Sequence, residues 1–272
     1  MVLQLSLFSV IDDDSYGLCV STLSNLSGKP PILYSNFAAV LKPNPEFDIE
    51  QTNSKNQLIE QNRLRLCKAV PLEALEPDVS KRDYGKLKQY GDDTLNGFNL
   101  GMLEDMLHGS TDLDRMEIDE AVCPNDDTWA LSISDIPAAG ASRKVSSQAI
   151  TESTILSSGG RSPSIVSFLS ELGYVLDFRL LTIGIKFNMS NKVFLEVSKI
   201  WQVQGAESTK QLTKGGFLIK AFVNVAKGTD IKSINHGTNA LLGLQKELSG
   251  YIDLSIPDRK SMDSRLENLS DL

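Results

Sequence analysis

Three stretches in the second half of the chain alternate apolar and polar side chains with the period of a β-strand, and they constrain the fold more than any other feature. They cover residues 174–189, 193–203 and 217–225. Short turn-like or glycine-containing connections separate them, which is typical of an antiparallel meander. In the first stretch the apolar phase changes from even to odd positions, and a β-bulge near Leu181 would explain this change. Because bulges bend long strands, the pattern favours a barrel.

The remaining segments are expected to add strands and helices around this meander. Strands are predicted at residues 1–11, 32–41, 63–68 and 251–256. Helices are predicted at residues 14–26, 164–172 and 239–249, where apolar residues recur at helical spacing and a glycine follows the last turn. For the middle helix we expect Ser162 as the N-cap and Pro163 at the first helical position.

Negative charge is concentrated in one segment. Residues 92–127 contain 11 acidic side chains and one basic side chain, Arg115, in a chain whose formal net charge is -8. Low hydrophobicity and like-charge repulsion oppose folding, so we expect a disordered acidic insert at about residues 71–127, with one possible short strand at 84–90. The simplest interpretation of this insert is a solvated loop with no role of its own. We also expect a flexible C-terminal tail at about residues 266–272.

The composition excludes several classes of protein. The chain has no run of about 18 apolar residues, so we expect no membrane span. Cysteines at positions 19, 67 and 123 are odd in number and widely spaced, which argues against a disulfide framework or a cysteine zinc cluster. The excess of acidic residues argues against a protein that binds nucleic acid by neutralising many phosphates.

The sequence offers no recognisable catalytic constellation. His108 lies in the acidic insert and His236 in a loop rich in glycine and asparagine, so neither is expected to serve as a fixed general base. A metal site inside a barrel would need two acidic residues two positions apart on one strand, so that both point inward. The late strands carry only single acids, Asp177 and Glu196. We therefore expect no enzyme, no cofactor and no metal.

Apolar residues occupy both faces of the late strands, which indicates a surface that something else covers. Opposite the regular core positions, one strand places apolar side chains beside Glu196 and the next beside Lys220. If the odd-numbered residues form the core, these side chains need a helix from a partner or from this chain. The candidate partner-binding residues are Phe194, Ile200, Leu218 and Phe222, together with Leu18 and Thr22 on the less apolar side of the first helix.

Eight short motifs, in order along the chain, resemble the fungal form of Mediator subunit 18. They are residues 1–8 (MVLQLSLF), 41–45 (LKPNP), 134–140 (SDIPAAG), 172–175 (LGYV), 181–184 (LTIG), 215–218 (GGFL), 228–231 (GTDI) and 257–265 (PDRKSMDSR). The resemblance covers roughly residues 1–69 and 128–265 and leaves out the acidic insert.

This resemblance implies both a fold and a role. The fold is mainly β within the α+β class: one domain over residues 1–272, built as an antiparallel β-barrel with flanking helices. Its shape is similar to the triphosphate-tunnel barrel, without the catalytic carboxylate pairs. The role is that of a non-catalytic, nuclear subunit of the Mediator head module, a coactivator that links regulators to RNA polymerase II. The implied partners are Mediator subunit 20 as a heterodimer, the C-terminal helix of Mediator subunit 8, other head-module subunits and RNA polymerase II.

Two other interpretations stay open from the residues. A divergent metal-dependent triphosphate hydrolase would use the barrel lumen and would need at least two acids converging there. A nucleic-acid-binding barrel would bind in a strongly salt-dependent way, and the charge balance makes it the weaker of the two.

Overall fold

The structure is a computed structural model, and it describes residues 1–47, 54–56, 61–75, 84–91, 95, 98–108, 128–140, 143–156, 164–205 and 208–266. The strands within these residues are β1 (Val2–Asp12), β2 (Ile32–Pro43), β3 (Leu64–Ala69), β4 (Thr128–Ser134), β5 (Ser146–Leu156), β6 (Tyr174–Asn188), β7 (Phe194–Val203), β8 (Thr209–Gln211) and β9 (Gly216–Val225). The helices are α1 (Tyr16–Ser27), α2 (Leu72–Leu75), α4 (Gly101–His108), α5 (Ile165–Glu171) and α6 (Ile231–Leu248), with the 3₁₀ helices η1 (Tyr84–Gln89), η2 (Ser190–Lys192) and η3 (Lys260–Met262).

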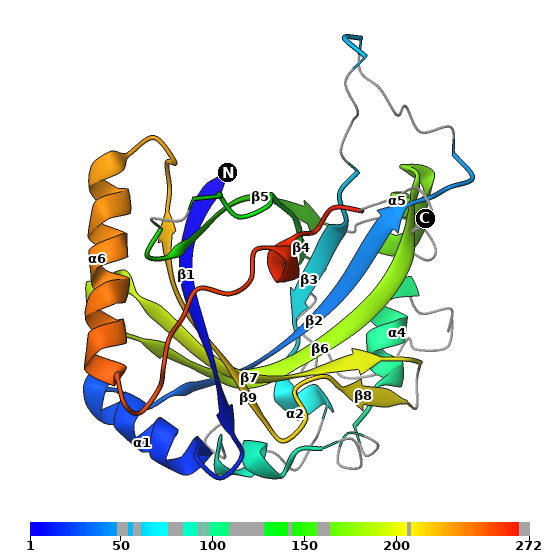
Figure 1. Cartoon of the computed structure of the whole chain (residues 1–272). Helices are drawn as coiled ribbons and strands as arrows, with labels where there is room; N and C mark the ends of the chain where they lie inside the picture. Colours follow the sequence, from blue (N-terminus) through cyan, green and yellow to red (C-terminus); the bar gives the residue numbers. More distant parts are fainter. Residues whose placement is uncertain are drawn as a thin grey trace.

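Eight of the described strands form a closed antiparallel barrel. They follow the order β6, β2, β3, β4, β5, β1, β9, β7, and β7 pairs back with β6. The short strand β8 pairs with residues 201–203, at the C-terminal end of β7, and with no other described strand. Figure 1 shows the strands curving around a common centre, with α1 and α6 on one outer side and α4 on the other. The predicted fold class, an antiparallel barrel with flanking helices, is confirmed.

Two strand predictions need correction. The predicted bulge exists, but it lies at Asp177, where the pairing of β2 with β6 shifts between Val40 and Leu41, and not near Leu181. The predicted strand at residues 251–256 is wrong. Its only pairing in the structure is a single bridge between Phe8 and Ser255. One bridge leaves most of this segment's backbone outside the sheet.

The three predicted helices form, but each starts at another residue: α1 at Tyr16, α5 at Ile165 and α6 at Ile231. α5 is capped by Ser164, whose hydroxyl accepts a hydrogen bond from the Ser167 amide. The predicted cap, Ser162, lies outside the described residues. α6 begins eight residues earlier than predicted, after Asp230, whose side chain accepts from the Ser233 amide. His236 therefore lies on a helix and not in a loop. None of the described helices has the length and hydrophobicity needed to cross a membrane.

The hydrophobic core lies between the outer wall of the barrel and these helices. Tyr16 of α1 stacks on Phe217 of β9, with ring centroids 4.2 Å apart. Gly237 of α6 fits against β1 and β9 so closely that a Cβ there would come within 3.1 Å of the Leu5 and Val223 side chains. The odd-numbered residues of β1, β7 and β9 therefore face outward, into the core.

Part of the segment predicted to be disordered is folded against the barrel. α2, η1 and α4 all lie within residues 71–127, and the predicted strand at 84–90 is the 3₁₀ helix η1. Their buried side chains include Leu72, Leu75, Leu87, Leu103 and Leu107. The disorder prediction is therefore wrong for these residues, because the burial of several leucines outweighs the charge of the acids before residue 109. Of the 11 acidic residues, seven fall within residues 112–127.

The rest of that prediction stays a prediction. Residues 109–127 lie outside the described part of the chain, as do residues 267–272 of the predicted flexible tail. Leu266, the first residue assigned to that tail, is described, and its amide donates to the Gln61 carbonyl at 2.9 Å.

Lys199 of β7 fastens the folded part of the insert to the barrel. This residue is 1% exposed, and its Nζ donates to the carbonyls of Lys88 and Tyr90 at 3.1 and 3.0 Å. The same Nζ lies 2.9 Å from the Asp13 Oδ1 and above the Phe217 ring. One buried ammonium thus joins β7, η1 and the turn between β1 and α1.

Replacing Lys199 with methionine should destabilise the chain by about 2–4 kcal/mol, because two carbonyls and a carboxylate lose their shared partner. Thermal unfolding measures the loss, and Lys210→Met is the matched control, since Lys210 on β8 is exposed. Equal melting temperatures for the two variants would show that Lys199 is not an anchor.

Candidate functional site

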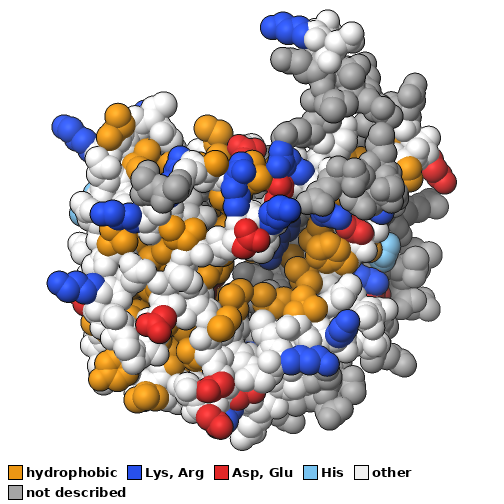
Figure 2. Space-filling model, in the orientation of Figure 1, with side chains coloured by type: hydrophobic (Ala, Val, Ile, Leu, Met, Phe, Trp, Pro, Cys, Tyr) orange, Lys and Arg blue, Asp and Glu red, His pale blue; other side chains and the backbone are white. Residues whose placement is uncertain are grey.

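The inner wall of the barrel is the main candidate site. Since successive side chains of a strand point to opposite faces, the residues that alternate with the core positions face the lumen. On β7 and β9 these are the even-numbered residues. On β3 they are Arg65 and Cys67, which pair with Val40 and Ala38 of β2. Figure 2 shows a hollow at the centre of this face, with apolar walls and with Lys and Arg side chains gathered above it.

Four of the predicted partner-binding residues lie in this lumen. Phe194 and Ile200 of β7 and Leu218 and Phe222 of β9 are all half-buried on the inner face. They lie apart from the core, as their alternation predicts, but no described helix covers them. The helices cover the opposite face instead, because closing the sheet turns the second apolar face inward.

The aromatic side chains of the inner wall surround one lysine. Phe194 and Phe222 stack with centroids 5.5 Å apart. Lys220 Nζ lies 5.0 Å from the Phe222 centroid and 5.8 Å from that of Phe8 on β1. Cation–π contacts of this kind stabilise an ammonium that has little access to water.

Further charged groups lie around Lys220. Glu196 is the cross-strand neighbour of Lys220 on one side and of Lys186 on the other. Burial lowers the pKa of Lys220, while the Glu196 carboxylate raises it and the Arg65 guanidinium lowers it. Burial also raises the pKa of the Tyr34 phenol, and Glu196 adds to that rise. Two lysines, a tyrosine and one carboxylate thus lie near one another on the inner wall, within electrostatic range of the exposed Arg65.

The C-terminal strap, residues 255–266, covers the polar end of the lumen. Met262 contacts the lumen side of β5: its carbonyl accepts from Gln148 Nε2 at 3.2 Å, and its sulfur lies 3.5 Å from the Ser146 hydroxyl. Arg259 Nε donates to the Pro137 carbonyl at 2.7 Å. Arg265 pairs with Asp263 and lowers the pKa of that carboxyl. Figure 1 shows the strap in red, with η3, in front of the barrel.

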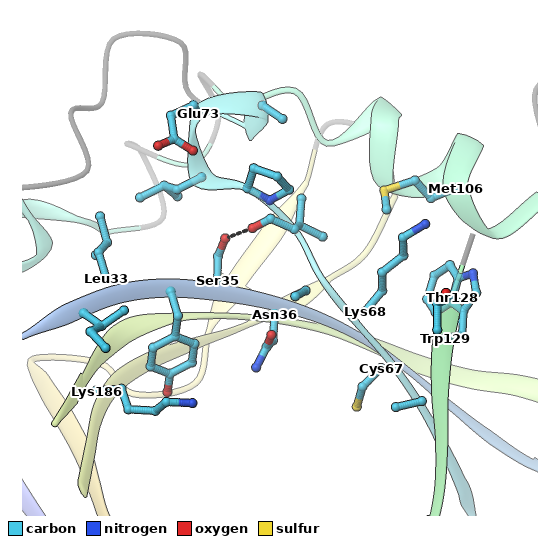
Figure 3. Close-up of a pocket in the computed structure, with 18 of the residues that line it drawn as sticks. Leu33, Ser35, Asn36, Cys67, Lys68, Glu73, Met106, Thr128, Trp129 and Lys186 are labelled. Atoms are coloured by element: carbon cyan, nitrogen blue, oxygen red, sulfur yellow. Dashed lines mark hydrogen bonds between the residues drawn. The ribbon is translucent and has the colours of Figure 1, made fainter. Parts of the chain in front are cut away.

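A cavity of about 1130 Å³ opens beside β2 and β3. It reaches the lumen through Tyr34, Lys186 and Glu196, and the outer wall through Lys68 and Trp129. Figure 3 shows Asn36 and Cys67 on one side of these strands and Ser35 and Lys68 on the other. The lumen is therefore reached through an opening beside β2.

The other two predicted residues lie on the outer surface. Leu18 of α1 is 64% exposed and Thr22 is half-buried on the same side of the helix. A second group of exposed apolar residues lies at α5. Phe168 and Leu172 are exposed, although they recur at helical spacing with the buried Ile165 and Leu169. Phe47 is also exposed, and its ring lies 3.5 Å from where a Cβ on Gly173 would be. No signal in the sequence distinguishes Phe168 and Leu172 from the buried Ile165 and Leu169.

The acids of the inner wall do not form a metal site. Among the residues that the structure describes, no three His, Cys, Asp or Glu side chains come together as metal ligands. Asp177 pairs with Arg63 at 2.9 Å, and Glu196 lies between two lysines. This geometry suits binding of a negatively charged group and not activation of a metal-bound water.

Comparison with known proteins places the chain in a family. The family model described as Med18 protein matches residues 3–265. The chain belongs to the Med18 family. It is 43% identical to Mediator of RNA polymerase II transcription subunit 18 of Saccharomyces cerevisiae, over 98% of each chain. It is 45% identical to the subunit of that name from Kluyveromyces lactis, over 99% of this chain and 100% of the other.

A solved structure shows the same fold. A chain in the structure of the Schizosaccharomyces pombe Mediator head module aligns with a TM-score of 0.60, at 12% identity, over 97% of this chain and 100% of that chain. The predicted family, that of the non-catalytic subunit 18 of the Mediator of RNA polymerase II transcription, is therefore confirmed.

The lumen depends on a close approach between β6 and β7 at Gly184. A Cβ on this residue would lie 2.5 Å from the Val197 carbonyl oxygen and 2.7 Å from the Ser198 Cβ. We expect Gly184→Ala to destabilise the chain by about 1–3 kcal/mol, since one of the two strands must shift.

Chemical denaturation of both variants measures this effect against Gly243→Ala. Gly243 lies on the exposed side of α6, and a Cβ there would meet no atom within 4 Å, so this change should raise stability by about 0.5–1 kcal/mol. A neutral Gly184→Ala would mean that β6 and β7 can separate at this point without cost.

Proposed function

We propose that this Med18 chain acts in the nucleus as a docking subunit, which pairs with Mediator subunit 20 and receives the C-terminal helix of Mediator subunit 8. Through these contacts it holds regulators near RNA polymerase II. The observation that supports this proposal is full-length family membership in a chain whose outer helices leave large apolar side chains uncovered.

We propose the outer face of α1 as the first of these docking surfaces. The inner face of the helix is already used: Tyr16, Cys19, Val20 and Leu23 are buried against the barrel. Leu18 and Thr22 lie one helical turn apart on the other side, and Leu26, 43% exposed, lies one turn further. Apolar side chains at this spacing suit a partner helix that packs along α1.

The four lumen residues are not part of this surface. Phe194, Ile200, Leu218 and Phe222 face the inside of a closed barrel, so a helix that packs on the outer wall does not reach them.

Co-expression of the chain with subunit 20 and the subunit 8 tail should yield one complex that stays together during gel filtration. Leu18→Glu should weaken this assembly roughly tenfold or more, because it places a charge in an apolar contact. Titration of labelled subunits, followed by fluorescence anisotropy, measures the change.

Leu172→Glu is the matched control, since Leu172 is also exposed but lies after α5. Both variants should melt at the wild-type temperature. If the three subunits elute separately at micromolar concentration, the docking role is wrong. If only Leu172→Glu weakens the assembly, the docking surface is the α5 side and not α1.

A further inference from the structure

We propose that the barrel lumen binds a compact anion with two or more negative charges, held between Lys220, Lys186 and Arg65. This site is separate from the outer docking surface, so the two proposals can fail independently. It rests on the position and pairing of the three basic side chains and on the half-buried state of Lys220 and Lys186; Arg65 is exposed.

The three cations come from three strands and face one space. Lys220 of β9 and Lys186 of β6 flank Glu196 of β7, because these strands are neighbours and the three residues are in register. Arg65 reaches the same space from β3, since its charge acts on both Lys220 and Tyr34. An anion at the centre would therefore meet positive charge from two sides of the barrel.

The three basic side chains differ from two other arginines near the lumen, because each of those arginines forms an ion pair with an aspartate. Arg63 pairs with Asp177 at 2.9 Å, and Arg265 pairs with Asp263 at 2.8 Å. Within the described part of the chain, Lys220, Lys186 and Arg65 make no ion pair. Glu196 of β7 and Glu152 of β5 also occupy positions that face the lumen. The three cations still outnumber these two acids, although the net charge of the chain is -8.

Burial makes this excess positive charge costly. Desolvation is the main cause of the lowered pKa of Lys220, and Glu196 offsets it only in part. A low-dielectric cavity lined by one sign of charge attracts ions of the opposite sign more strongly than an open surface does. A bound anion would favour the charged form of Lys220 and accept hydrogen bonds from the basic side chains and from the Tyr34 hydroxyl.

The shape of the lumen favours a compact ligand over a peptide. An extended peptide is usually bound along an open strand edge, and the closed barrel offers none on its inner face. The strap covers one end, and the cavity of about 1130 Å³ reaches Tyr34, Lys186 and Glu196 from the side. Of the three basic residues, Lys186 lines this cavity.

Calorimetric titration of the full chain with pyrophosphate and, separately, with citrate tests the proposal. We expect saturable binding of pyrophosphate that weakens as salt is raised. Lys220→Met and Arg65→Met should each reduce the affinity roughly tenfold or more, because each removes one charge-assisted contact. In Lys220→Met, the methionine side chain retains the contact with the Phe8 and Phe222 rings. Melting curves of both variants identify any loss of folding.

Lys227→Met is the matched control, since Lys227 is exposed beyond the end of β9 and should leave the affinity unchanged. Binding of pyrophosphate alone would assign the site to phosphate compounds, and binding of both probes would assign it to polyanions in general. The proposal fails if neither probe saturates below about 10 mM. It also fails if folded Lys220→Met and Arg65→Met bind as tightly as Lys227→Met.

Discussion

Closure of the sheet by the pairing of β6 with β7 is the constraint on which the rest of the structure depends. In an open sheet, a second apolar face must be covered by a helix or by a partner. Once β6 and β7 pair, the face that carries Phe194 and Phe222 becomes the inside of a barrel, and the other face becomes the wall against which α1 and α6 pack. The same alternation of side chains would give an exposed apolar face in an open sheet, and it gives an apolar lumen in a closed one.

The alternation, the antiparallel order and the positions of most helices are local properties, and the sequence predicted them well. Closure is a long-range property: β6 pairs with β7 as a local hairpin, but it must also pair with β2, more than a hundred residues earlier. No local pattern reports such a pairing. This is why the apolar inner residues could be identified from the sequence but were assigned to a docking surface instead of the lumen.

The structure of the insert could not be predicted from its charge composition either. The average charge of the insert predicts disorder, yet the Leu72, Leu87 and Leu103 side chains are buried in the hydrophobic core. Lys199 makes this possible, because its ammonium satisfies carbonyls of η1 in a region from which water is excluded. A lysine at a core position of a strand breaks the apolar pattern in the sequence. Its contacts in the folded chain explain why a lysine is accommodated there.

The inner wall keeps room that a purely structural barrel would fill. Eight strands enclose a space that side chains can just fill or that holds one small ligand. Here the inner-wall positions of Ala38, Gly184 and Ser198 carry small residues. Filling the lumen with leucine and valine would cost less than burying Lys220 beside two phenylalanines with one shared carboxylate. The stability of the barrel therefore does not explain these charges, which is the reason for the proposed anion site.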